Sequence, residues 1–229
     1  AIGFHALSAV TTTDDSIGIG TYAGASSSAV IVAIGRSAAG SNTSGTGNTA
    51  VGHNALNANV DGDNNTAVGY TALFTMEPAD GNSGNTAVGF QAGYGISSGV
   101  YNTAIGAYAL DAHPGTAAYN TAVGHKALTT VTSGGNNTAV GESAMISIST
   151  GEQNVGIGRD ALYTNQQGDN SIAIGNNTLH NQNPSGNVNM YNVAVGHAAG
   201  YAVTTGTHNV VVGGLAGDAI NTGSQNTAL

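Results

Sequence analysis

Groups that carry chemistry are few in this chain of 229 residues, which holds 12 acidic residues, 7 histidines and no cysteine. The segment Gly95-Ile96-Ser97-Ser98-Gly99 matches the pattern of a hydrolase nucleophile, but no strand-to-helix context surrounds it. The histidines, among them His113, His180 and His208, show no metal-ligand spacing, and the lack of cysteine excludes thiolate sites. We therefore predict no catalytic residue, no metal and no cofactor, and expect that the protein is not an enzyme.

Two further patterns have ordinary explanations. Gly18-x-Gly20-x-x-Ala23 and Gly156-x-Gly158-x-x-Ala161 mimic a dinucleotide-binding fingerprint, but no helix is expected after either. Asp61-Gly62-Asp63-Asn64-Asn65 is an oxygen-rich turn of the kind that holds Ca²⁺, and an ordinary acidic turn is the default interpretation. Neither pattern changes the expectation of a non-catalytic protein.

One short phrase, N-T-A-V-G or a near variant, sets the positions of all these groups. Its closing glycine, here called the repeat glycine, recurs at intervals of 17, 15, 17, 17, 20, 17, 18, 17, 17, 17, 21 and 17 residues. So short and regular a period indicates a solenoid, in which each coil is too small to bury its own apolar face. The repeat glycines are Gly3, Gly20, Gly35, Gly52, Gly69, Gly89, Gly106, Gly124, Gly141, Gly158, Gly175, Gly196 and Gly213.

Aligned on the repeat glycine, the copies show fixed columns that predict a short strand. The residue before it is always Ile or Val, which we interpret as buried. The residue two before it is small, usually Ala, and is expected to face neighbouring chains. The residue three before it is Thr in several copies and Val or Ile in later ones. The residue four before it is usually Asn, which predicts a stacked ladder of Asn side chains. Examples of these structural positions are Asn48, Val51, Gly52, Asn102, Ile105, Gly106, Ile174 and Gly175.

A coil of 17 residues needs stacking to be stable. Burying about three aliphatic side chains contributes roughly 1.5–3 kcal/mol each, whereas ordering the backbone costs about 1–2 kcal/mol per residue. We therefore predict an all-β, parallel β-solenoid of about thirteen coils, forming one repetitive domain over residues 1–229 and covered by companion chains. Because the phrase is cut at both Ala1 and Leu229, a fragment of a longer protein is expected.

The positions that the repeat leaves free are the candidates for contact with a partner. His53, Tyr70 and Phe90 follow repeat glycines in consecutive coils and predict an aromatic strip, for which simple cross-coil stacking is the favoured interpretation. Glu142 and Arg159 hold equivalent positions and are expected to pair.

The over-length coils predict outward loops over residues 74–84 and 180–191, which contain Pro78 and Pro184; the third proline, Pro114, lies in the 18-residue interval. Where the usual Leu is missing, Tyr94 and Tyr201 are expected to fill the gap. The candidate surface contacts are His53, Tyr70, Phe90, Tyr108, Met76 and Met190.

The net charge of the chain limits the classes of partner that are expected. The formal net charge is −9 and only Arg36, Lys126 and Arg159 are permanently positive, so nucleic acid is not an expected partner. No apolar run approaches 18 residues, so no membrane insertion is expected in this segment.

The phrases N-T-A-V-G-x-x-A-L, N-V-A-V-G and S-I-A-I-G resemble the head repeat of YadA-like trimeric autotransporter adhesins and related repeats of phage tail fibres. The resemblance covers the whole chain, although the period of 17 departs from the shorter adhesin-head period. It implies a left-handed β-roll, a homotrimer, and attachment to a host glycan or protein from a bacterial outer surface or a virion fibre.

Other functions stay open on sequence grounds. An alternative function is that of a fibre spacer that has no binding role of its own. A flat-faced ice-binding solenoid would use the column from Thr49 to Thr138, but the change of that column to Val and Ile suggests an inward position instead. A carbohydrate-active β-helix enzyme needs paired carboxylates on adjacent coils, and Glu142, Asp160 and Asp218 offer no evident pair.

Overall fold

The chain folds as a parallel β-solenoid of about 12–13 coils of roughly 17 residues, as the repeat predicts. The computed structural model describes residues 1–10, 15–77, 81–111 and 115–229, and within these ranges it contains strands and turns but no helix. Two compact units divide the chain, residues 1–117 and residues 118–229. The expectation of one domain over the whole chain stays a prediction.

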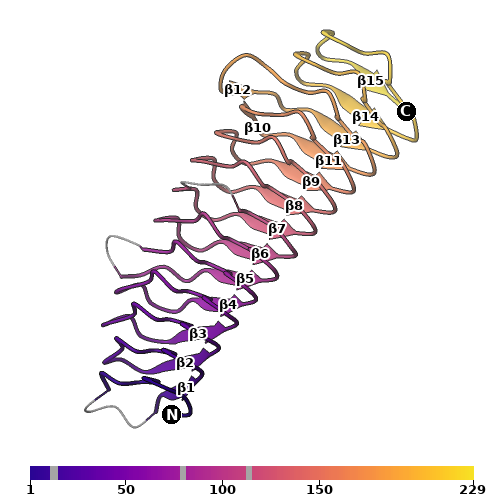
Figure 1. Cartoon of the computed structure of the whole chain (residues 1–229). Coiled ribbons are helices and arrows are strands. Elements are labelled where there is room, and N and C mark those ends of the chain that lie inside the picture. The colour runs from indigo at the N-terminus through magenta and orange to yellow at the C-terminus, as the bar shows by residue number, and fades with distance from the viewer. Residues whose placement is uncertain (11–14, 78–80, 112–114) are drawn as a thin grey trace. The chain divides into compact units, whose positions relative to one another are not determined.

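In the first unit, six short strands pair in chain order and in parallel register (Figure 1). Residues at the same place in the repeat are direct partners, as with Thr49 and Thr66 or Val51 and Val68. The strands are β1 (Ile17–Ile19), β2 (Ile31–Ile34), β3 (Asn48–Val51), β4 (Thr66–Val68), β5 (Thr86–Val88) and β6 (Thr103–Ile105).

The second unit repeats this arrangement and adds a short second ladder. Gly168–Asp169 (β10) pairs in parallel with Val188–Asn189 (β12), next to the main sheet. The main sheet contains β7 (Thr121–Val123), β8 (Thr138–Val140), β9 (Val155–Ile157), β11 (Ile172–Ile174), β13 (Val193–Val195), β14 (Val210–Val212) and β15 (Thr227–Ala228).

The Asn ladder is confirmed. Asn154 is fully buried, and its backbone N–H donates to Asn137 Oδ1 of the preceding coil at 3.0 Å. Its own Nδ2 donates to the carbonyl of Gly168 at 2.8 Å, so one side chain joins two coils and also closes a turn. Asn85 does the same in the first unit, receiving Asn102 N–H at 2.9 Å and donating to Gly99 O at 2.9 Å. Because these amides are buried and bonded, they hold the coils in register.

The repeat glycine is required by backbone conformation and by space. Gly141 has a φ of +136°, and a Cβ there would lie 2.7 Å from the carbonyl oxygen of Gly158 in the next coil. Only a residue without a side chain permits this close backbone approach. The same applies to Gly52 and Gly175, and Gly106 has a similar φ of +130°.

The interior is narrow and is filled by four inward positions of each coil. These are the Ala two before the repeat glycine, the Ala and Leu three and four after it, and the residue seven after it. Ala139, Ala144, Met145 and Ile148 are the four in one coil, and each is fully buried. The seventh position was not recognised from the sequence, because it is Val, Ile or Met in some coils, such as that of Ile148, and Ser, Asn or Gln in others, such as that of Asn59.

The predicted facing of the strand is wrong. The small residues, such as Ala104 and Ala122, point into their own coil and are at most 1% exposed, whereas Ile105 and Ile174 point outward and are 41% and 37% exposed. The size limit comes from the coil's own core, since a Cβ at Gly156 would lie 2.9 Å from the end of the Met145 side chain. Val51 also lies on the outward face. Small side chains therefore mark the narrow interior, not contact with another chain.

Candidate binding surface

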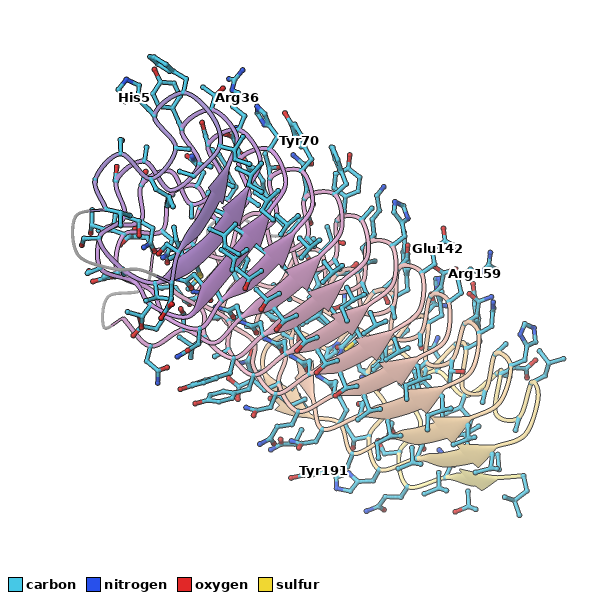
Figure 2. All side chains as sticks on the ribbon, turned by 90° about the horizontal axis from the view of Figure 1, so that it is seen from below. His5, Arg36, Tyr70, Glu142, Arg159 and Tyr191 are labelled. Carbon is cyan, nitrogen blue, oxygen red and sulfur yellow. The ribbon has the colours of Figure 1, made fainter. Side chains whose placement is uncertain are left out.

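The outward face of each sheet carries two columns of β-branched side chains. The first outward column lies three residues before the repeat glycine, and the second outward column lies one residue before it. Along a strand the two positions are about 6.6 Å apart, and successive coils are about 4.8 Å apart. Every member of both columns in the strands is Thr, Val or Ile, so the face carries no charge. In Figure 2 the strands present this face between two edges of projecting side chains.

The second outward column is aliphatic in every strand that reaches it. In the first unit it comprises Ile19, Ile34, Val51, Val68, Val88 and Ile105. In the second unit it comprises Val123, Val140, Ile157, Ile174, Val195 and Val212. Several members are about 40% exposed, among them Val88, Ile157 and Val212. An unbroken apolar strip of this kind is a feature of interaction sites more than of free surfaces.

The first outward column changes its chemistry along the chain. In β3 to β6 it is Thr in each strand, and within the described residues these four hydroxyls make no hydrogen bond to protein. In β9, β11, β13 and β14 the same column is Val or Ile, with Ile172 at 38% and Val210 at 41% exposed. The hydroxyls thus face solvent, and the sequence argument that this column points inward is overturned.

The predicted aromatic strip borders this face in the first unit. His53 and Tyr70 stack at 5.2 Å with an interplanar angle of 6°, and Tyr70 and Phe90 at 5.4 Å and 9°. Tyr108 meets Phe90 edge-on at 69°. Figure 2 shows Tyr70 projecting from the same edge as His5 and Arg36. Because the stacked ring faces cover one another, the strip presents ring edges to solvent and is a poor platform for a sugar.

A second set of stacked rings was missed from the sequence. It lies five residues after the repeat glycine, where Phe74 stacks on Tyr94 at 5.3 Å, and His180 lies between Tyr163 and Tyr201 at 4.9 and 5.0 Å. Tyr94 and Tyr201 therefore do not fill gaps in the core, and Tyr201 is 38% exposed.

The space left where Gly replaces the usual core Leu is filled from other inward positions. At Gly93, the nearest side chains to an added Cβ are Leu73 of the preceding coil and Ile96 of the same coil. At Gly200 the corresponding side chains are Leu179 and Val203.

Met76 and Met190 are not surface contacts, because both are fully buried. Met76 occupies the inward seventh position, where its sulfur accepts from Asn85 Nδ2 at 3.4 Å. Met190 packs over Gly168, 3.0 Å from the place a Cβ would take.

The 180–191 segment is consequently not a free loop, since it supplies β12 and the buried side chains of Gln182, Pro184 and Met190. Pro78 and Pro114 lie outside the described residues.

Several charged side chains form hydrogen bonds or ion pairs with nearby residues. Arg159 pairs with Asp160 at 3.4 Å, so the expected pair with Glu142 is wrong, although Figure 2 shows both side chains on one edge. Desolvation raises the pKa of Asp169 above its usual value, opposed by a hydrogen bond from the Glu152 backbone N–H. Desolvation likewise raises the pKa of Glu77, which accepts from Val60 N–H.

Ser97 and Asp63, which lie in the hydrolase-like and Ca²⁺-like patterns of the sequence, have structural partners. Ser97 Oγ donates to the carbonyl of Gly115 at 3.2 Å. In the acidic turn, one oxygen of Asp63 accepts from both the backbone N–H and the hydroxyl of Thr46. Within the described ranges, no three His, Asp or Glu side chains gather as metal ligands. In the same ranges there is no helix with the length and apolar character needed to cross a bilayer.

A groove of about 330 Å³ borders the face in the second unit, along three successive coils. One side is the first outward column, Val155, Ile172 and Val193; the other is formed by Gln153, Asn170 and Tyr191, five residues before their repeat glycines. Figure 2 shows Tyr191 projecting from the edge opposite to that of Glu142 and Arg159. This groove was not predicted from the sequence, because its walls come from positions that lie one coil apart.

No family description, curated protein or solved structure matches the chain. The surface just described is therefore interpreted from its own chemistry.

Proposed function

We propose that the chain is a structural and adhesive segment of an extracellular surface fibre, in which copies associate as a homotrimer through the second outward column. The observation that carries this proposal is the strip of Val and Ile that every strand of the second outward column continues, on a face without charge. Transfer of this strip from water to a neighbouring chain contributes roughly 25 cal/mol for each Å² of apolar surface covered. The surface covered in this trimer is the outward Val and Ile column, whereas the sequence predicted that the small-residue column would be covered.

The resemblance of the repeat phrase to adhesin heads and phage tail fibres supports the same proposal. The Asn ladder and glycine stack give a rigid scaffold that displays identical positions at each coil, which suits a fibre. The face holds no charged residue, and the net charge of −9 disfavours nucleic acid as a partner. Attachment is proposed to a host glycan or protein on the receiving surface.

The molar mass of the 229-residue chain in solution tests this proposal. A trimer of the 22.4 kDa chain is expected by light scattering or sedimentation equilibrium. Ile174→Lys should reduce association strongly, because a buried unpaired ammonium is costly. Asn176→Lys, two residues further along on the partly exposed edge, is the matched control and should remain trimeric. A folded native monomer would contradict the proposal.

A second candidate is supported by the outward Thr column. The hydroxyls of Thr49, Thr66, Thr86 and Thr103 form an in-register row beside a row of aliphatic side chains, on an uncharged face. Such a flat lattice of hydroxyl and methyl groups suits ordered water at an ice surface. A thermal hysteresis assay decides: activity that is lost in Thr86→Lys supports ice binding, and no activity at millimolar protein rejects it.

A further inference from the structure

We propose that the groove of the second unit is a binding site for a short neutral oligosaccharide lying along the coil stack. This inference deepens the proposed adhesive function, because it assigns a ligand class and a location to the attachment. The groove lies between the first outward column and the row Gln153, Asn170 and Tyr191, so it leaves the second outward column free for self-association.

One wall of the groove is apolar and the other is polar, and recognition of a sugar needs both. Val155, Ile172 and Val193 give an aliphatic wall that can pack against the C–H face of a sugar ring. Gln153 and Asn170 each carry an amide, which offers donors and an acceptor to sugar hydroxyls. Successive coils repeat this arrangement at about 4.8 Å, so a chain of sugar units meets similar contacts at each step. The volume of about 330 Å³ is at the lower end for small-molecule sites and fits a short oligosaccharide.

The polar groups of the groove are available to a ligand. Asn170 Nδ2 donates to Asn189 Oδ1 in the added ladder, which fixes the amide and leaves its own oxygen as an acceptor toward solvent. The side chain of Gln153 makes no hydrogen bond within the described part of the chain, and Gln153 is exposed. One preoriented amide and one adaptable amide therefore line the same wall.

Tyr191 closes one end of the groove and is placed there by the 21-residue coil. The preceding segment forms β12 and is held further by Gly186 N–H, which donates to Gln167 Oε1 at 2.8 Å. The Tyr191 ring is 49% exposed, and His208 of the next coil contacts it at 5.1 Å with a tilt of 49°. Tyr191 differs from the rings of the aromatic strip in its surroundings. One side of the ring contacts the aromatic ring of His208, and the other side, toward Asn170, borders the groove.

Charge and backbone bonding favour a neutral glycan over other ligands. The six lining residues are uncharged, while Glu152 and Asp169 adjoin Gln153 and Asn170 in the sequence and disfavour an anionic sugar. A peptide strand cannot be added to the sheet here, because the backbone N–H groups of Val155, Ile172 and Val193 already donate to the next coil at 2.8 Å.

The test measures binding of the chain to chitotetraose, cellotetraose and mannotetraose by calorimetry, with sialyllactose as the anionic comparison. At least one neutral probe should bind, and Tyr191→Asn should weaken it at least tenfold. Asn suits this variant because Asn170 adopts the same left-handed backbone, with φ of 57°. Gln153→Gly should weaken binding several-fold. Gln225→Gly removes the same side chain at the same repeat position outside the groove, and should bind as the native chain does.

The outcomes separate this inference from the fibre proposal. It is overturned if none of the three neutral probes binds, if Tyr191→Asn binds normally, or if Gln225→Gly is weakened equally. Preferred binding of sialyllactose would also contradict it. A trimeric protein that binds no neutral probe contradicts the groove alone, whereas a monomer whose binding depends on Tyr191 contradicts the trimer alone.

Discussion

The first outward column differs between two stretches of the main sheet, one in each unit, while the backbone beneath it does not. In β3 to β6 it presents Thr hydroxyls, and in β9, β11, β13 and β14 it presents Val and Ile, yet both stretches pair in the same parallel register. Thr, Val and Ile share a branched Cβ and therefore suit a strand equally well. The fold depends on the inward and glycine columns, and the outward column is free to differ in chemistry. This freedom is what makes the face a candidate for function.

The largest expected effect tests whether the glycine column is equally strict in both units. Gly52→Ala and Gly141→Ala place a Cβ against the carbonyl of the next repeat glycine, with φ of +137° and +136°. Strain and overlap together should destabilise each variant by about 3 kcal/mol or more. Chemical denaturation followed by circular dichroism measures this loss. A variant that melts like the native protein would contradict the close stacking in that unit.

The next effect compares the buried methionines of the two over-length coils. Met76→Ala and Met190→Ala each remove a fully buried side chain and should cost about 2–5 kcal/mol by leaving a cavity. Met→Leu at either site is the control and should cost less than about 1.5 kcal/mol. Thermal melting measures both. If alanine is harmless at Met190 but not at Met76, the coil containing β12 is looser than described.

A smaller loss is expected from the Asn ladder. Asn85→Ala leaves the N–H of Asn102 and the carbonyl of Gly99 without this partner, and Asn154→Ala leaves the N–H of Ser171 without its partner, while Gly168 O keeps a bond from Asn165. Each change should cost about 1–3 kcal/mol. Asn64→Gly, at an exposed position whose φ of 60° suits glycine, is the control for loss of an amide. Hydrogen exchange should show faster opening at Asn102 N–H in the first variant and Ser171 N–H in the second. Unchanged protection at these two amides would show that the ladder does not hold the register.

Exchange of the outward residues should leave stability nearly unchanged. Thr86→Val and Val193→Thr swap the chemistry of the two regions at half-exposed positions, and each should alter stability by less than about 0.5 kcal/mol. Denaturant midpoints measure the effect. A large loss in only one variant would mean that the two faces are packed differently, contrary to the comparison.

The smallest expected effect is the dependence of stability on pH, for which Glu77 in the first unit is compared with Asp169 in the second. Both carboxyls have a raised pKa in the folded chain, so above their ordinary pKa values of 4.5 and 3.8 the folded state binds more protons than the unfolded state. Stability should therefore fall slightly as pH rises through the window just above these values. Asp169→Asn should remove its share of this slope in melting curves between pH 3 and 7, and an unchanged slope would contradict that assignment.

Periodicity predicted the solenoid, the strand positions and the buried Asn ladder, because those depend on spacing that repeats in every coil. It could not decide which side of a three-residue strand is inside. Ala at the middle position fits a narrow core and a close chain contact equally well, so Ala104 was placed on the wrong side. The burial of Met76 was missed because the inward seventh position was not recognised, and that of Met190 because an inserted residue changes which later position points inward. The aromatic strip was predicted correctly from spacing alone.

By itself the sequence determined that short β-branched strands recur at one spacing, with glycine and asparagine where backbone space and buried amides demand them. Only the tertiary structure decided that Ala lies inside and that Thr, Val and Ile face out, because the width of the coil interior is set by Leu and Met side chains from elsewhere in the coil. It also decided that Tyr191 stands beside Gln153 and Asn170, since coil stacking brings together residues that are far apart in the chain.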